Sequence, residues 1–494
     1  MEINERFQTS TPEEQGVPSS SILEFIDEVE TRKLELHSIM LIRHGNIVAE
    51  GWWKPYSREH RHSLFSLSKA FTSTAIGLAI YEKLISIDDK VISFFPDDLP
   101  EIVTGSLKAM KIKHLLTMTS GHEEIKFSSN FRPRNDNWLQ AFLNEPVKYE
   151  PGTHFYYNNA ASYLLSAIIQ RVTGMTLFEY IEPLILQPLG IVGTTWDKCP
   201  HGVNNGATGL RMKTEDIAAF GQMYLNKGMW KGIRVVPEAW IDAATSSQVS
   251  IGEGDINDWH QGYGYQLWRC THDSYGAIGS FGQLCIVMPE QDAVLVLTSA
   301  VNDIPSVMSL VWTHLYDNMK NEAIPDNKSA YDNLQNRLEN LSLKNLPVSA
   351  SSPIIEQING AVYVPTIEFS NKDFEGEKVM KLDIDSLSIL FEDEKCLISY
   401  WENDGRSDIT CGLSEPTKTI GKLDMSKEAT ISIGTWIDNY TFCMNYRYIE
   451  TPFNEKTTCN FVDDKIIIEK LICVGDSTVE EYVFEGVIDI KEYY

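Results

Sequence analysis

Residues 64–76 read LFSLSKAFTSTAI and contain the only Ser-x-x-Lys of the 494-residue chain, Ser66-Leu67-Ser68-Lys69. The apolar residues recur with a helical period, which predicts that the motif opens a helix. One helical turn places residues i and i+3 on the same face, so Lys69 can reach the Ser66 hydroxyl. A desolvated lysine can take the proton of a serine and turn it into a nucleophile. The motif therefore predicts a nucleophile–base pair, and the alternative is a helix cap followed by a solvated lysine.

Strand patterns lie at both ends of the first 325 residues, and helical patterns lie between them. A β-hairpin is predicted over 38–43 and 47–52. Strand patterns return over 264–268, 282–287 and 293–298, before a closing helix at 303–321. This order predicts an α+β domain in which an antiparallel sheet is flanked by helices and carries an inserted helical domain over about 66–226.

The first 325 residues contain two further local patterns. Ser21 and Glu24 have the spacing of a capping box, which predicts a helix from Ser21 to about Arg32. His60 and His62 alternate around Arg61, a spacing that could start a zinc site. No second cluster of ligands accompanies them, so we interpret both histidines as structural residues.

The last third of the chain has a different character. Residues 326–353 are polar and rich in Asn and Ser, which predicts a linker with one helical segment. Short alternating runs at 380–384, 429–433, 440–446 and 465–469 then predict an antiparallel β domain over 354–494, either a barrel or a sandwich. The chain is therefore predicted to consist of three segments: a first domain over 1–325, the linker over 326–353, and the β domain over 354–494, which is lipocalin-like by analogy.

Composition limits the classes of partner. The formal net charge of −27 argues against nucleic acid and anionic membranes. The chain contains no apolar run of the roughly 18 residues that a membrane span needs and no visible secretory signal. Its eight cysteines are scattered without Cys-x-x-Cys, as expected of reduced thiols in a cytoplasmic protein. A small-molecule substrate is the expected partner, and the oligomeric state is left open.

A second polar motif follows at residues 151–159, which read PGTHFYYNN. A tyrosine phenol near a lysine can relay a proton, and an asparagine amide can bind both the lysine and a substrate carbonyl. Two Tyr-x-Asn pairs overlap here, Tyr156 with Asn158 and Tyr157 with Asn159. Spacing alone does not choose between them.

Six segments in order resemble the serine β-lactamase and penicillin-binding-protein superfamily, in particular its class C-like branch of carboxylesterases, D-aminopeptidases and aminohexanoate-oligomer hydrolases. The resemblance covers about residues 10–320. It is carried by FSLSK (65–69), HLLTMTSG (114–121), PGTHFYYNN (151–159), the segment 184–195 with QPLG, GLRMKTEDI (209–217) and GAIGSFGQ (276–283).

The resemblance implies a site. Its phase, Pro-Gly-x-x-Phe-x-Tyr-x-Asn, selects Tyr157 and Asn159. Ser66 would be acylated, Lys69 and Tyr157 would share the general-base work, and Asn159 would orient the substrate. The backbone N–H groups of Ser66 and Ser280 would form the oxyanion hole, and Gly279 would let the substrate backbone approach. No metal or organic cofactor is expected.

One departure from the family pattern bears on the substrate. The third motif is usually Lys-Thr-Gly or His-x-Gly, whereas this chain has Ala277-Ile278-Gly279. The missing cation would hold a substrate carboxylate. We therefore expect a serine hydrolase that cleaves an amide, peptide or ester bond through a Ser66 acyl-enzyme. The alternatives are a β-lactamase or DD-peptidase, and a receptor that deacylates slowly.

Overall fold

The computed structural model describes residues 6–123, 137–252, 258–343, 349–372, 384–402, 405–420 and 429–488. The chain divides into two compact units. Unit 1 comprises Met1–Trp52, Arg61–Ser299 and Asp303–Asn340, and unit 2 comprises Trp53–His60, Ala300–Asn302 and Leu341–Tyr494. Helix α11 (Lys328–Glu339) falls in the predicted linker and belongs to unit 1. Residues 344–348 of that linker lie outside the described residues.

A seven-stranded sheet forms the centre of unit 1, with strand order β1-β3-β2-β12-β11-β10-β9. The strands are β1 (Gln8–Thr9), β2 (Leu36–Arg43), β3 (Asn46–Trp52), β9 (Trp268–Arg269), β10 (Tyr275–Gly279), β11 (Gln283–Met288) and β12 (Ala293–Ser299). The hairpin β2–β3 near the N-terminus joins strands β9 to β12 of the same sheet through an antiparallel β2–β12 pair. The predicted sheet of sequence-distant parts with a helical insertion is thereby confirmed.

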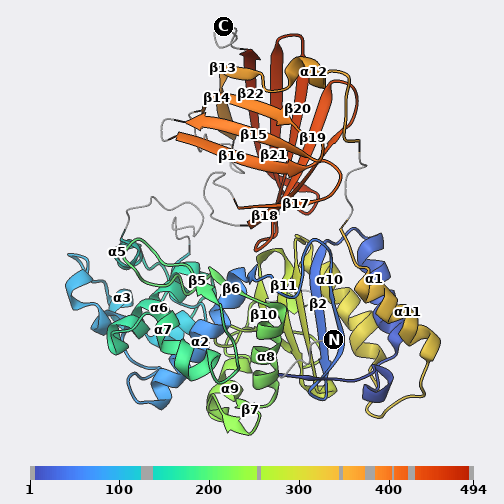
Figure 1. Cartoon of the computed structure of the whole chain (residues 1–494). Coiled ribbons are helices and arrows are strands. Elements are labelled where there is room, and N and C mark those ends of the chain that lie inside the picture. The colour runs from blue at the N-terminus through green and yellow to red at the C-terminus, as the bar shows by residue number, and fades with distance from the viewer. Residues whose placement is uncertain are drawn as a thin grey trace. The chain divides into compact units, whose positions relative to one another are not determined.

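Helices cover both faces of this sheet. Figure 1 shows α8 (Thr214–Leu225) on one side and α1 (Ser19–Thr31), α10 (Ile304–Leu310) and α11 on the other. Helix α8 packs closely because Gly221 has no side chain: a Cβ there would lie 2.7 Å from both Cys285 Sγ and Val294 Cγ1. The closing helix predicted at 303–321 is α10, which continues as a π turn over Val311–Leu315 and a 3₁₀ turn over Tyr316–Asn318.

Two local predictions were wrong. Helix α1 begins at Ser19 rather than at a Ser21 cap, because the Glu13 carboxylate accepts from the Ser19 backbone N–H and satisfies that end of the helix. The strand predicted at 264–268 is only the two residues of β9, because Gly264 to Leu267 form a turn closed by a Gly264 N–H to Leu267 carbonyl bond. Gln266 occupies this turn with φ 64°.

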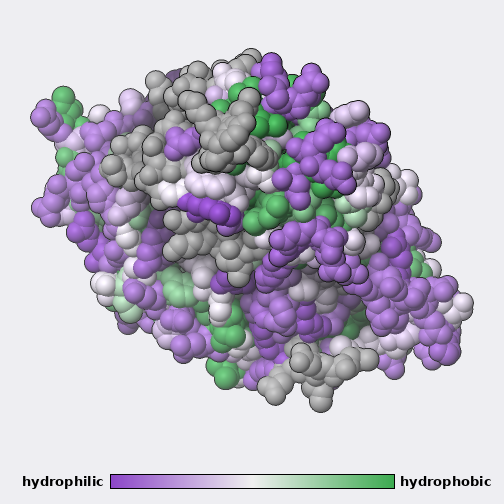
Figure 2. All heavy atoms as spheres, turned by 45° about the horizontal axis from the view of Figure 1, so that its top comes forward, coloured by the Kyte–Doolittle hydropathy of each residue, from purple (hydrophilic) through white to green (hydrophobic). Residues whose placement is uncertain are grey.

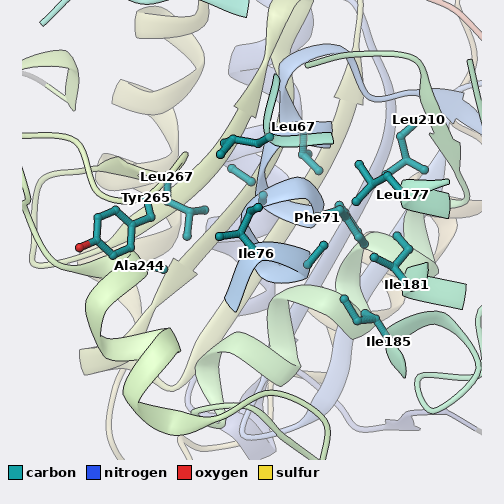
Figure 3. Close-up of a cluster of buried hydrophobic side chains, with 14 of the residues drawn as sticks. Leu67, Phe71, Ile76, Leu177, Ile181, Ile185, Leu210, Ala244, Tyr265 and Leu267 are labelled. Carbon is teal, nitrogen blue, oxygen red and sulfur yellow. The ribbon is translucent and has the colours of Figure 1, made fainter. Parts of the chain in front are cut away.

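The inserted region is helical and is built around α2 (Ser68–Tyr81), whose residues 68–79 are all buried. Figure 3 shows Phe71 of α2 beside Leu177 and Ile181 of α7, and Leu210 of β6 belongs to the same core cluster. The other elements of this region are α3 (Gly105–Ala109), α4 (Ile112–Leu116), α5 (Trp138–Asn144), α6 (Asn159–Thr173), α7 (Leu177–Ile181), β4 (His62–Ser63), β5 (Thr195–Trp196), β6 (Leu210–Met212), β7 (Met229–Trp230), β8 (Ile233–Arg234) and α9 (Glu238–Thr245). A helix buried on all sides holds the side chains of its first turn rigidly.

Unit 2 is a β-barrel with the strand order β16-β15-β14-β13-β22-β21-β20-β19-β18-β17. Pairing of Gly412 in β16 with Ile433 in β18 closes it. Its strands are β13 (Val362–Lys372), β14 (Ile384–Phe391), β15 (Lys395–Glu402), β16 (Gly405–Gly412), β17 (Thr417–Ile420), β18 (Ala429–Trp436), β19 (Thr441–Tyr448), β20 (Phe453–Val462), β21 (Lys465–Val474) and β22 (Ser477–Ile488), with the short helix α12 (Ile355–Ile358) before them. The barrel alternative of the predicted β domain is the one that forms; residues 380–383 of the first predicted strand lie outside the described residues.

Charged and polar side chains dominate the coloured part of the face shown in Figure 2. Figure 2 shows that hydrophilic residues cover most of the coloured area in view and that hydrophobic ones are gathered in small patches. No helix among the described residues is both long enough and apolar enough to cross a membrane.

Candidate active site

Ser66 lies in η2 (Phe65–Leu67), a 3₁₀ turn that leads directly into α2. The residue before it, Phe65, has φ 47°, a left-handed conformation that is unfavourable for a bulky side chain. The end of β10 holds this turn from one side. A Cβ on Gly279 would lie 2.2 Å from the Leu64 carbonyl oxygen and 3.2 Å from the Leu67 nitrogen, so only glycine fits there. Backbone strain next to a half-buried serine is common at functional sites.

Lys69 points back along α2 to the hydroxyl of Ser66. Its Nζ lies 2.9 Å from Ser66 Oγ, 2.8 Å from Asn159 Oδ1 and 3.0 Å from the carbonyl oxygen of Ala207. Lys69 is only 1% exposed, and these three oxygen atoms carry no formal charge. Burial therefore lowers the pKa of Lys69 well below its ordinary value.

Helix α6 begins at Asn159, and Tyr157 lies two residues before the start of this helix. Asn158 caps the helix, because its Oδ1 accepts from the backbone N–H groups of Ala160 and Ala161. Asn159, the first helical residue, is the one whose amide oxygen contacts Lys69. The two asparagines of the overlapping Tyr-x-Asn pairs thus have separate roles in the structure, one at the helix end and one at the lysine.

Tyr157 completes the group. Its side chain is hydrogen-bonded to Ser66, and Lys69 Nζ lies 4.8 Å from the centroid of its ring. Burial raises the pKa of the Tyr157 phenol to about 12, with the Ser66 hydrogen bond acting in the opposite direction. The structure therefore brings Ser66, Tyr157 and Asn159 together around the amine of Lys69.

Ser280 follows Gly279 and begins a second 3₁₀ turn, η7 (Ser280–Gly282). The backbone N–H of a residue in the first turn of a helix has no acceptor within that helix. The two turns also meet through their aromatic neighbours: Phe65 and Phe281 make an edge-to-face contact at 5.1 Å, and Phe281 has φ 62°. The N–H groups of Ser66 and Ser280 are therefore carried by two adjoining turns.

The third motif has no cation in this structure either. Ala277, Ile278 and Gly279 are buried in β10, and Ala277 packs into the same core cluster as Leu64 and Leu67. An alanine in this position contributes apolar contact to the core and no charge to the site.

The histidines near the site have structural contacts. His62 is buried, and its Nε2 lies 3.0 Å from Nδ1 of His37. Burial, followed by the neighbouring His37, lowers the pKa of His62 to about 3, so His62 is neutral at pH 7. Within the described residues, no group of three or more His, Cys, Asp or Glu side chains is arranged to hold a metal ion.

Two features of the site were missed from the sequence. The Ala207 carbonyl bonds to Lys69, but any residue type offers a carbonyl, so the sequence carries no trace of it. Trp268 stacks on the ring of Tyr157 with centroids 5.7 Å apart and planes at 22°. The aromatic composition of residues 259–268 could have indicated this contact, but the strand prediction at 264–268 gave no direction for the ring.

Comparison with known proteins shows the family to which the sequence is similar. Residues 27–314 match the family model described as Beta-lactamase. Over 321 residues the chain is 24% identical to 6-aminohexanoate-dimer hydrolase of Paenarthrobacter ureafaciens, covering 60% of this chain and 81% of that protein. It is 25% identical to esterase EstB of Burkholderia gladioli over 190 residues, which are 34% of this chain and 48% of the esterase.

The solved structure of an octameric penicillin-binding protein homologue from Pyrococcus abyssi has the same fold. It aligns with a TM-score of 0.51 and 17% identity, covering 94% of this chain and 99% of that one. Because the family model spans more than half of the sequence, the chain belongs to the beta-lactamase family, and it is a serine hydrolase of that type. The resemblance inferred from the ordered motifs is confirmed, and so is the predicted fold class.

Proposed function

We propose that this protein cleaves an amide or ester bond of a small molecule through a covalent acyl-enzyme on Ser66. The observation that carries the proposal is the set of three contacts made by Lys69. A neutral amine has two N–H donors and one lone pair. The two donors match Asn159 Oδ1 and the Ala207 carbonyl, which leaves the lone pair for the hydroxyl proton of Ser66 at 2.9 Å.

The pKa directions assign the proton-transfer roles. Lys69, whose pKa is lowered by burial, is the base that takes the Ser66 proton as Oγ attacks the substrate carbonyl carbon. Tyr157, whose pKa is raised to about 12, remains a phenol at neutral pH and gives its proton to the leaving nitrogen or oxygen. Lys69, protonated in the first step, returns a proton to Tyr157. This division of work is narrower than the shared general-base role expected from the family.

The oxyanion that forms on the carbonyl oxygen would be bound by the N–H groups of Ser66 and Ser280. Such preorganised donors are among the largest contributions to catalysis, because they point to where charge develops. Asn159 would orient the substrate while it holds Lys69. In the second half of the reaction, water attacks the acyl carbon and the same groups reverse their proton transfers.

The amide or ester class rests on the third motif and on the relatives. Ala277 contributes no cation to anchor a substrate carboxylate, which disfavours the β-lactamase and DD-peptidase alternatives. The relatives described above are named as a dimer hydrolase and an esterase. Cleavage of an amide or ester is the chemistry that fits both observations.

A fluorophosphonate probe tests the nucleophile. The wild type should be labelled on Ser66, and Ser66→Ala should lose both labelling and turnover of short esters. Ser93→Ala, which changes an exposed serine of the 3₁₀ turn Val91–Phe94, is the matched control and should keep both. Labelling that survives in Ser66→Ala would exclude Ser66.

A substrate panel separates the alternatives. Multiple turnovers on short amides or esters support the hydrolase. A stable acyl adduct in intact-mass spectrometry would instead support a slowly deacylating receptor. Nitrocefin hydrolysis as fast as ester hydrolysis would support the β-lactamase.

A further inference from the structure

The ring of Tyr157 is one member of a continuous aromatic surface. We call this surface the aromatic wall and define it as Phe155, Tyr157, Trp259, Tyr263 and Trp268. Trp268 is its centre: it stacks on Tyr157, and its centroid lies 4.9 Å from Tyr263, 4.8 Å from Trp259 and 6.4 Å from Phe155. The proposed proton donor is therefore the end of an aromatic surface rather than an isolated phenol.

The wall is only partly covered by protein. Tyr263 is the buried member of the wall. Phe155, Trp259 and Trp268 are half-buried, as is Tyr157 itself. Large aromatic side chains bind apolar and aromatic groups well when a face or edge remains accessible. A partly exposed wall next to a reacting group is suited to contact the substrate.

The segment that carries Trp268 is held rigidly. Tyr265 and Leu267 are buried near Ile76 of α2, as Figure 3 shows. Between them, the Gln266 side chain donates to the backbone carbonyls of Leu115 and Leu116. A side chain on such a support keeps its position while a ligand binds, which is what a specificity-determining residue requires.

Charge near Trp268 is already neutralised. Arg269, the next residue, is bound to Asp273 at 2.9 Å and to the Thr245 carbonyl at 3.2 Å. On the neighbouring strand β10, the family's cation is replaced by Ala277. The features that border Tyr157 on this side therefore favour an uncharged group over a carboxylate.

We infer that the aromatic wall binds the leaving group of the substrate and that Trp268 determines its specificity. The inference rests on the proposed function, because a phenol that protonates the leaving nitrogen or oxygen must lie beside it. The rings that continue from Tyr157 then contact whatever is attached to that atom. The preferred leaving group is an uncharged alcohol or amine that bears an aromatic ring or an extended apolar chain.

The test compares two esters with the same acyl group and similar primary alcohols, 2-phenylethyl acetate and ethyl acetate. The wild type should favour the phenylethyl ester in kcat/KM by roughly tenfold, the upper end of a well-formed aromatic contact. Trp268→Ala should remove most of this preference, mainly through a higher KM, while Trp268→Phe should retain most of it. Melting temperatures verify that both variants fold, and Trp268→Leu replaces Trp268→Ala where the alanine variant is unstable.

A second measurement does not depend on turnover. The product 2-phenylethanol should slow fluorophosphonate labelling of Ser66 in the wild type and lose this effect in Trp268→Ala, whereas ethanol should have no effect on either. An equal loss on both esters in Trp268→Ala, or a wild type that does not discriminate, would overturn the inference and leave the Ser66 mechanism intact. Failure of Ser66 to react with the probe would instead remove the proposed function on which it rests.

Discussion

Each unit of the molecule contains a lysine that is at least half-buried, Lys69 and Lys470, and the two differ in the charge of what surrounds them. Lys69 in unit 1 contacts a hydroxyl, an amide oxygen and a backbone carbonyl. Lys470 in the barrel forms an ion pair with Glu455 at 3.1 Å, and that carboxylate is 2% exposed. Glu455 also accepts from the Tyr448 hydroxyl at 2.8 Å and from Thr457 at 2.9 Å.

The difference shows how the environment of a buried amine selects its use. A buried amine among neutral acceptors loses the solvation of its charged form and has no opposite charge to replace it, so it becomes a base. A half-buried amine beside a buried, hydrogen-bonded carboxylate keeps a charged partner and contributes to structure. The predictions below alter one of the two lysines, or exchange their surroundings.

Removal of each amine should separate the two roles most strongly. Lys69→Met removes the proposed base and should lower kcat by about 10³-fold or more, within the range for loss of a general base or triad member. Lys470→Met should leave ester turnover largely unchanged and lower the stability of the barrel instead. Steady-state kinetics with melting curves for both variants measure this contrast. Equal activity loss in both would remove the distinction.

Asn159→Asp gives Lys69 the kind of neighbour that Lys470 has. The new carboxylate would lie beside Nζ, 2.8 Å from it in the present geometry, and favour the ammonium form. An opposite charge at this distance raises the pKa of a lysine by about 1–3 units. Because the base must be neutral, kcat/KM at a pH below the pKa of Lys69 should fall roughly tenfold for each unit by which that pKa is raised. The pH–rate profile should move to higher pH as well, and Asn159→Ala should not reproduce that displacement.

The pH profile of the wild type tests the roles without a substitution. Lys69 must be deprotonated, so kcat/KM should rise with pH through the lowered pKa of Lys69, below the ordinary value near 10.4. Tyr157 must be protonated, so activity should persist until the pH approaches its pKa of about 12. Initial rates from pH 5 to 10 measure the rising limb. A decline in this range that is not caused by unfolding would contradict the assignment of Tyr157.

Glu455→Gln should have the smallest effect on catalysis. The amide keeps an acceptor for Tyr448 but removes the charge opposite Lys470, at a cost of about 1–3 kcal/mol in the free energy of unfolding of the barrel. Ester turnover should stay at the wild-type level. Urea unfolding followed by tryptophan fluorescence measures the stability change. Unchanged stability would show that Glu455 and Lys470 contribute little as a pair.

Prediction from the sequence succeeded where local patterns decide the outcome. The helical period of 64–76 and the strand pattern of 293–298 predicted elements that form at those positions. It failed where a group outside the recognised motif makes the contact: the Glu13 carboxylate, and not a Ser21 cap, accepts from a backbone N–H at the N-terminus of α1. The direction of the Trp268 ring was equally beyond the sequence, because it depends on a turn held by the Leu115 and Leu116 carbonyls.

By itself, the sequence determined the family, the chain order in which the sheet strands flank the helical insertion, and the residue types of the site. Motifs with fixed spacing between neighbouring residues are local properties, so they can be recognised without the tertiary structure. The resemblance selected Asn159 over Asn158. Only the tertiary structure decided the distances from Lys69 to its neighbours, that Ala207 is one of them, and that an aromatic wall continues from Tyr157. These relations join segments separated by about 90 to 140 residues. They depend on burial, which sets both the direction of a side chain and the pKa of a lysine, and burial is a property of the packed chain.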